Sequence, residues 1–83
     1  MSRKRKRLDA NHAEIRAALE ACGYRVVSLS GLGGGVPDLL TCRRGQLELV
    51  EVKSAQGKLR PEQSRFQADG WPVRVICSVL EVR

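Results

Sequence analysis

The chain has 83 residues, which is enough for one domain with a small core. Its hydrophobic content of 42% and charged content of 29% are typical of a globular protein and argue against a disordered one. No apolar run approaches the ~20 residues that a membrane span requires, and the N-terminus is charged rather than signal-like. We therefore expect a soluble, intracellular protein of the cytoplasm with no membrane partner.

The net charge of +6 is concentrated at the N-terminus, where five of the fifteen basic residues lie and leave ten against nine acidic ones elsewhere. Residues 1–8 are predicted to form a flexible basic arm in front of a single domain over 9–83. Such runs of like charge commonly bind phosphate without sequence preference. The alternative is a solvated tail that only aids solubility. The arm's candidate DNA-binding residues are Arg3, Lys4, Arg5, Lys6 and Arg7.

The cysteine and histidine content argues against a zinc site and against a nucleophilic enzyme. Cys22, Cys42 and Cys77 are widely spaced, the sequence has no CxxC motif, and His12 is the only histidine. A Ser/His/Asp or Cys/His site would have to use His12, which no motif supports. Each cysteine lies in an apolar segment, so we expect buried thiols.

The first predicted element is a helix. Apolar residues recur at helical spacing over about 11–22 and indicate an amphipathic helix there. Asn11 at its start and Glu14 three residues later form a capping-box pattern. Gly23 suits the left-handed position that follows a helix C-terminus.

Three strands are predicted in the middle of the chain, the last two of them joined by a tight turn. Residues 25–30 have the β-branched content of a strand and are followed by a glycine-rich loop. Pro37 favours an extended backbone before it and leads into a strand at about 38–42. Residues 43–46 have the composition of a hairpin turn, and the next strand follows at 47–53.

The strand at 47–53 is apolar in the middle on both faces, which suits a central strand covered on both sides. Glu51 and Lys53 share one face at its C-terminal end. After a polar loop, Pro61 starts a helix at about 61–69, and residues 73–77 form the last strand. Ser78 is a candidate cap for a final short turn. The predicted order is α-β-β-β-α-β.

The hairpin should bring Asp38, at the start of its first strand, close to Glu51 and Lys53 at the end of its second. Two carboxylates can hold a hard divalent cation, which would neutralise their mutual repulsion, and the Val52 carbonyl is a candidate third ligand. The metal would lower the pKa of a bound water and polarise a phosphate, while Lys53 orients the nucleophile. The alternative is a surface ion pair, with Asp38 as an ordinary turn residue.

Four short motifs occur in order from Asn11 to the C-terminus. They are Asn11-His-Ala-Glu14, Gly35-Val-Pro37-Asp38-Leu39-Leu40, Leu49-Val-Glu51-Val-Lys53 and Leu59-Arg-Pro61-Glu62-Gln63. Each alone is weak, but GxPD, ExK and PEQ at this compact spacing are specific. In this order they resemble the VRR-NUC family of the PD-(D/E)xK nuclease superfamily.

The resemblance implies an α/β, restriction-endonuclease-like fold with a mixed central sheet flanked by helices. It also implies a DNA nuclease with Mg²⁺ or Mn²⁺ as cofactor, often a homodimer, of a small type found in bacteria and bacteriophages. By this resemblance, Asp38, Glu51 and the Val52 carbonyl would be metal ligands, and Lys53 would be the catalytic lysine. The place of action would be the cytoplasm of a bacterial or phage-infected cell.

Three further residues are candidates for the active site or for contact with DNA. The family places an acidic residue of the first helix near the metal, which makes Glu14 a candidate ligand, although the capping box alone also accounts for it. Gln63 matches a glutamine that the family keeps near the active site. Arg60 stands where a Ser or Thr helix cap is expected, so it is a candidate phosphate contact.

Two classes of function remain open. The first is a metal-dependent DNA endonuclease, selective for branched or junction DNA, in which a dimer presents two sites symmetrically. The second is a DNA-binding module that retains the nuclease fold without cutting. A dimer is expected because two helices would leave apolar surface near Trp71, Val73 and Val75 uncovered. Trp71 and Tyr24 are candidates for base stacking, with core packing or a dimer contact as the alternative.

Overall fold

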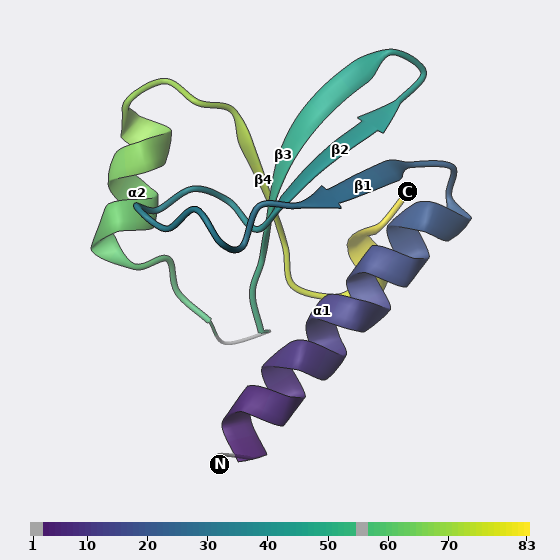
Figure 1. Cartoon of the computed structure of the whole chain (residues 1–83), viewed down its shortest axis with the longest axis horizontal. Coiled ribbons are helices and arrows are strands. Elements are labelled where there is room, and N and C mark those ends of the chain that lie inside the picture. The colour runs from purple at the N-terminus through teal and green to yellow at the C-terminus, as the bar shows by residue number, and fades with distance from the viewer. Residues whose placement is uncertain (1–2, 55–56) are drawn as a thin grey trace.

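A computed structural model describes residues 3–54 and 57–83. The predicted order α-β-β-β-α-β is confirmed, with a short 3₁₀ helix added at the end (Figure 1). The elements are α1 (Arg3–Ala21), β1 (Arg25–Ser28), β2 (Leu39–Arg43), β3 (Gln46–Val52), α2 (Pro61–Ala68), β4 (Val73–Ile76) and η1 (Val79–Glu81). Within the described residues, no helix is long and apolar enough to cross a membrane.

The four strands form one mixed sheet in the order β1-β2-β3-β4. The first two pairings are antiparallel, and β3 and β4 are parallel because α2 carries the chain back between them. The β2–β3 hairpin closes at Arg44 and Gly45, which both have positive φ, at 55° and 78°. Two such residues in a row give a turn whose twist matches that of the flanking strands.

The start of α1 differs from the expectation. The helix begins at Arg3, so it runs through the described part of the segment expected to be a flexible arm. Asn11 consequently lies inside the helix, and the predicted capping box with Glu14 is wrong. Arginine, lysine, leucine and alanine favour helix, and neither glycine nor proline occurs between residue 3 and residue 11 to stop it from extending.

The other end of α1 matches its prediction. Gly23 has a φ of 92°. Its N–H donates to the Glu20 carbonyl, and the Tyr24 N–H donates to the Leu19 carbonyl, both at 3.0 Å. This pair of bonds is the Schellman arrangement, which satisfies carbonyls at a helix C-terminus. Ser78 also has its predicted role, because its hydroxyl accepts the Leu80 N–H at the start of η1.

The core lies between α1 and one face of the sheet. Ile15 and Leu19 are fully buried against Leu39, Val50 and Ile76, with Tyr24 and Val52 at the margin. Tyr24 is therefore a core residue, and its ring also stacks under the Arg43 guanidinium. The described cysteines are free thiols, but Cys22 is exposed and Cys42 and Cys77 are only partly buried, whereas buried thiols were expected.

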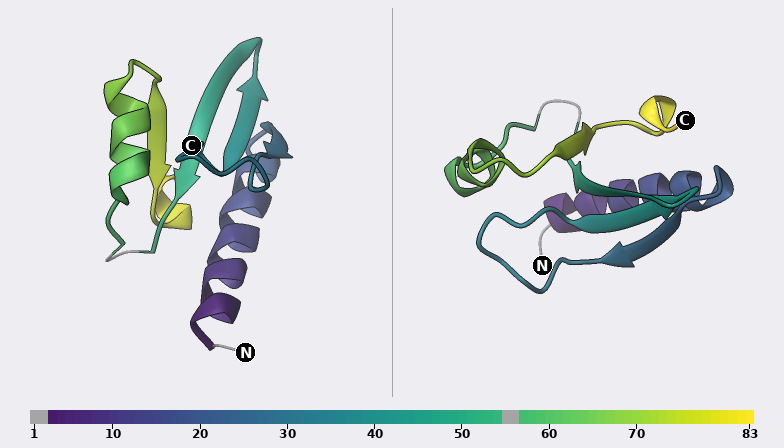
Figure 2. Two further views of the ribbon diagram at one scale, coloured as in Figure 1. Left: turned by 60° about the vertical axis from the view of Figure 1, so that its left-hand side comes forward. Right: turned by 90° about the horizontal axis from the view of Figure 1, so that it is seen from above.

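The opposite face of the sheet is covered only in part. Val50, Glu51 and Val52 are all buried, so the C-terminal end of β3 is covered on both sides as expected, whereas its N-terminal half is open on this face. Figures 1 and 2 show α2 beside β4, at the far side of the molecule from α1. Leu47 is 70% exposed and Trp71, stacked on Phe66, is 55% exposed. We call the row of Val27, Leu40, Leu47, Leu49 and Trp71 the outer apolar face, since the strand pairings place its first members side by side.

Gly35 fixes the glycine-rich loop to α2. Its φ is 80°, and a Cβ at this position would collide with the main-chain carbonyl of Glu62. Because Gly35 has no side chain, the glycine-rich loop can pack directly against the first turn of α2. This contact holds that turn, and with it Gln63, over the end of β3.

Candidate active site

The hairpin register brings two of the predicted site residues together. Leu39 pairs with Val50, and the same antiparallel register continued by one residue puts Asp38 opposite Glu51. Pro37 ends the preceding loop, is fully buried, and sets the extended backbone from which Asp38 projects. The proximity expected from the hairpin is thus present in the fold.

Asp38 is held mainly through one oxygen. Its Oδ2 accepts the Val52 N–H at 2.8 Å and lies 3.3 Å from His12 Nε2. Burial by itself raises the pKa of Asp38, but the hydrogen bonds from His12 and Val52 outweigh it and leave that pKa below its ordinary value. Asp38 is therefore an ionised carboxylate at neutral pH.

The pKa of Glu51 is shifted in the opposite direction to that of Asp38. Glu51 is only 3% exposed, and its Oε2 accepts a hydrogen bond from Gln63 Nε2 at 3.0 Å. Burial, followed by the negative charge of Asp38, raises the pKa of Glu51 to about 7, and Lys53 counteracts this only in part. A buried carboxylate pair with one member protonated is the arrangement that a bound cation would relieve.

Lys53 and the Val52 carbonyl lie beside these carboxylates. Lys53 Nζ is 3.5 Å from Glu51 Oε2, and its side chain is 16% exposed. In a strand, the N–H and C=O of one residue point to the same side. Because the Val52 N–H reaches Asp38, the Val52 carbonyl also points to the side where β2 has ended.

Gln63 connects α2 to the site. Its amide nitrogen donates to Glu51, and its Oε1 accepts the Arg60 N–H at 2.8 Å. The second bond is one half of a capping box, so the missing Ser or Thr at Arg60 is partly compensated by Gln63. Gln63 therefore positions Glu51 through a hydrogen bond, and its residue is only 6% exposed.

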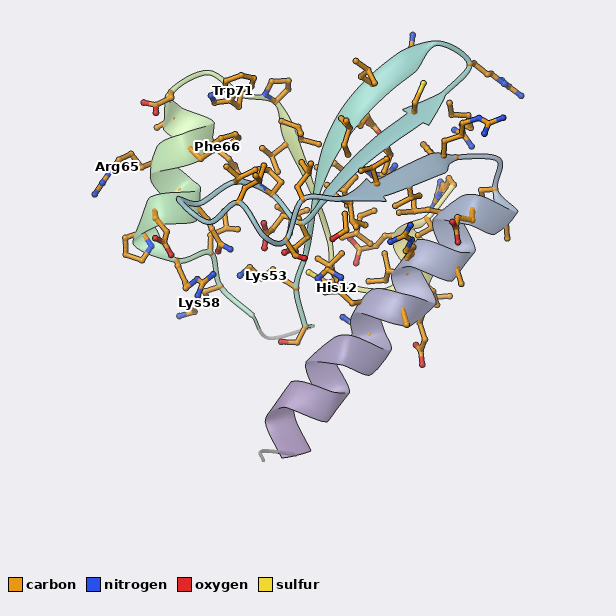
Figure 3. The ribbon with its side chains drawn as sticks, viewed as in Figure 1. His12, Lys53, Lys58, Arg65, Phe66 and Trp71 are labelled. Carbon is orange, nitrogen blue, oxygen red and sulfur yellow. The ribbon has the colours of Figure 1, made fainter. Side chains whose placement is uncertain are left out.

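These residues line one open pocket of about 380 Å³. Its lining includes Asp38, Glu51 and Lys53, and also Lys58 and Arg60. Figure 3 shows that the labelled residues come from different elements, with His12 on α1, Lys53 at the end of β3 and Lys58 in the segment before α2. The pocket thus combines carboxylates, which suit a metal ion, with cationic side chains, which suit a phosphate.

His12 and Lys58 are pocket residues that the sequence reasoning did not identify. A signal for His12 existed, because His12, Ile15 and Leu19 follow the spacing of one helix face, and the last two are core residues. Lys58 offered no signal beyond its charge. Its place in the pocket follows from the path of the segment that leads into α2.

Glu14 lies elsewhere. It is exposed on α1, and the pocket-lining residues do not include it. Only Ala13 separates it from His12, and side chains two positions apart point to nearly opposite sides of a helix. Its role as a metal ligand stays a prediction. The side chains of Arg3 to Arg7 lie outside the described part of the structure, so their DNA-binding role also stays a prediction.

The donor set suits a hard divalent cation. Mg²⁺ typically binds through one or two carboxylates and keeps several waters. Among residues 3–54 and 57–83, no three His, Cys, Asp or Glu side chains gather around one point. Asp38, Glu51 and the Val52 carbonyl would thus supply the protein ligands for Mg²⁺ or Mn²⁺, and water or phosphate oxygens would supply the rest.

Comparisons with known proteins identify the family of the chain. A family model described as the VRR-NUC domain matches residues 3–75. A solved structure described as a VRR_NUC domain is 32% identical, with a TM-score of 0.66, over 89% of this chain and 87% of that one. No curated protein sequence gives a significant match. The chain, with its restriction-endonuclease-like α/β fold, belongs to the VRR-NUC domain family of nucleases, whose substrate is DNA.

Proposed function

We propose that this nuclease is a divalent-metal-dependent DNA endonuclease that hydrolyses phosphodiester bonds. The observation that carries the proposal is the placement of Asp38 opposite Glu51, with Lys53 Nζ 3.5 Å from Glu51, in one open pocket. A protein that only binds DNA has no use for two carboxylates facing a phosphate, because they repel it.

Each residue of the pocket has a separate task in this proposal. Asp38, Glu51 and the Val52 carbonyl hold Mg²⁺ or Mn²⁺, which when bound acidifies water and polarises a phosphate. Lys53 orients the attacking water and offsets charge on the phosphate. Gln63 keeps the Glu51 carboxylate aimed into the pocket, and Lys58 and Arg60 contact neighbouring phosphates.

A plasmid-nicking assay tests the activity. Supercoiled DNA should be converted to open circles in Mg²⁺ or Mn²⁺, and excess EDTA should stop the conversion. Asp38→Asn protein, purified in parallel, controls for contaminating nucleases. Equal nicking by the variant would assign the activity to a contaminant. DNA binding without nicking in any divalent metal would instead support the second candidate, a non-catalytic DNA-binding module.

The basic run that starts α1 is proposed to bind the DNA backbone. Deleting residues 2–7 should weaken DNA binding and flatten its dependence on salt, by about 0.9 in the slope of log K against log salt for each phosphate that the variant no longer binds. Fluorescence anisotropy between low and moderate salt measures this slope. Equal slopes for the full chain and the deletion variant would exclude the segment from the interface.

A homodimer is proposed to form through the outer apolar face. Leu47→Glu should convert a dimer into a monomer at micromolar concentration, as measured by light scattering, because it places a charge in that face. The fold should persist, since Leu47 is 70% exposed. Leu32→Glu is the matched control, because Leu32 is 68% exposed but lies in the glycine-rich loop. A monomeric mass for the unmodified chain would reject the dimer.

Two symmetric sites at a fixed separation suit paired cuts on a branched duplex. We therefore expect a four-way junction to be cleaved faster than a linear duplex of the same sequence, and expect Leu47→Glu to reduce this preference. Equal rates on both substrates would leave the nuclease activity intact and remove the preference for branched DNA.

A further inference from the structure

Two consecutive residues of α1, Asn11 and His12, contact active-site residues of the β2–β3 region. His12 Nε2 lies 3.3 Å from Asp38 Oδ2, and Asn11 Nδ2 donates to the Lys53 carbonyl at 3.1 Å. Both α1 residues are half-buried. One turn of a helix thus reaches both a carboxylate at the start of β2 and the main chain of the lysine after β3.

The contact with Asp38 uses an oxygen that is already engaged. Asp38 Oδ2 accepts the Val52 N–H at 2.8 Å, so a main-chain donor and a side-chain donor reach the same oxygen from two elements. A carboxylate held in this way cannot rotate freely. The Glu51 side chain is a further hydrogen-bond partner of this carboxylate, which the contacts thus hold facing Glu51.

Direct ligation of the metal by His12 is the alternative, since imidazole is a common ligand. Two observations oppose it. His12 Nε2 faces a carboxylate oxygen, the place of a hydrogen-bond donor, and the described residues form no cluster of three His, Cys, Asp or Glu side chains. Hydrogen-bonding partners of metal ligands, in contrast, orient those ligands and typically change metal affinity or activity ~10–100-fold.

We propose that Asn11 and His12 form a positioning clamp, in which His12 orients Asp38 for the metal and Asn11 fixes the main chain of Lys53. The clamp rests on the metal-dependent function proposed above. Gln63 does the same for Glu51 from α2. One carboxylate is thereby held from α1 and the other from α2.

Calorimetric titration with Mn²⁺, without DNA, tests the clamp separately from cleavage. His12→Ala should lower Mn²⁺ affinity by at least about tenfold. His12→Gln, which keeps a donor of similar reach, should restore it to within about threefold of the unmodified chain. Glu20→Gln, exposed and farther along α1, is the control. In the Asp38→Asn background, His12→Ala should have no further effect, because the two residues act through one contact.

Asn11 gives a different readout. Asn11→Ala should leave Mn²⁺ affinity unchanged and lower the single-turnover cleavage rate, since its contact is with Lys53. Asn11→Asp should be slower still, because its carboxylate would face the Lys53 carbonyl. Pulsed EPR of bound Mn²⁺ should show no coupling to an imidazole nitrogen.

Several outcomes overturn the clamp. Nitrogen coupling that disappears in His12→Gln would make His12 a ligand. Full Mn²⁺ affinity in a folded His12→Ala variant, or an additive effect in the Asp38→Asn background, would refute the positioning role and leave the metal-dependent function standing. An unmodified chain that binds no Mn²⁺ would overturn that function, and the clamp with it.

Discussion

Asp38→Asn and Glu51→Gln should each lower Mn²⁺ affinity by more than about a hundredfold and reduce nicking by about a thousandfold or more. Each substitution replaces a charged ligand with a neutral one of the same shape. The fold should persist, because an amide oxygen can still accept the Val52 N–H at position 38 and the Gln63 amide at position 51. Calorimetry measures the affinity, and supercoiled plasmid measures the cleavage.

Glu62→Gln is the matched control for these variants. Glu62 is an exposed carboxylate in the first turn of α2 and pairs with Arg60, so its loss changes the net charge equally without touching the ligand set. Its Mn²⁺ affinity should equal that of the unmodified chain. Undiminished metal binding in both Asp38→Asn and Glu51→Gln would remove the metal assignment altogether.

The same Glu51 substitution should change how stability depends on pH in the absence of metal. Because the folded pKa of Glu51 is raised from 4.5 to about 7, its stabilising contribution is complete below pH 4.5 and is lost as pH rises through 7. The loss is on the order of 3 kcal/mol. Glu51→Gln should flatten this part of the profile in EDTA. Denaturant unfolding at pH 5 and pH 8 compares the two proteins, and parallel profiles would contradict the raised pKa.

Lys53→Ala should separate metal binding from catalysis. Its cleavage rate should fall at least about a hundredfold, the typical cost of losing one group that stabilises a transition state electrostatically. Mn²⁺ affinity should be equal or higher, because a positive charge 3.5 Å from Glu51 Oε2 is removed. Single-turnover cleavage at saturating DNA and calorimetry give the two quantities.

Two further variants sharpen this result. Lys53→Arg keeps the charge but replaces a compact ammonium with a planar fork, so it should recover little activity. Lys58→Ala removes a lysine of the same pocket that lies farther from the carboxylates, and it should weaken DNA affinity with little change in the rate at saturation. A Lys53→Ala variant that cuts at the normal rate would refute the proposal that Lys53 positions the nucleophile.

The order of the elements follows from local patterns in the sequence. Gly23 ends α1, Arg44 and Gly45 turn the hairpin, Pro61 starts α2, and Ser78 caps η1, each through an interaction within a few residues. The start of α1 was the exception, because like charge suggested an arm while residue composition favoured helix.

The carboxylate pair of the site was also accessible from the sequence. Asp38 directly precedes β2 and Glu51 lies on β3, which a short turn joins to β2, and the two-residue repeat of a strand leaves little freedom in how such strands pair. Once the turn is placed, the two carboxylates must come together, and Lys53 follows on the same face.

The contributions of the helices were decided by tertiary packing alone. Which side of α1 meets the sheet depends on burying Ile15 and Leu19, and that rotation brings His12 to Asp38 while Glu14 faces solvent. The position of α2 depends on the close contact between Gly35 and Glu62, which places Gln63 on Glu51. The sequence by itself determined the strands and the residues that they carry, because strand pairing is local and periodic. Only the tertiary structure decided which helical side chains reach the site, because helix rotation is set by packing between residues far apart in the chain.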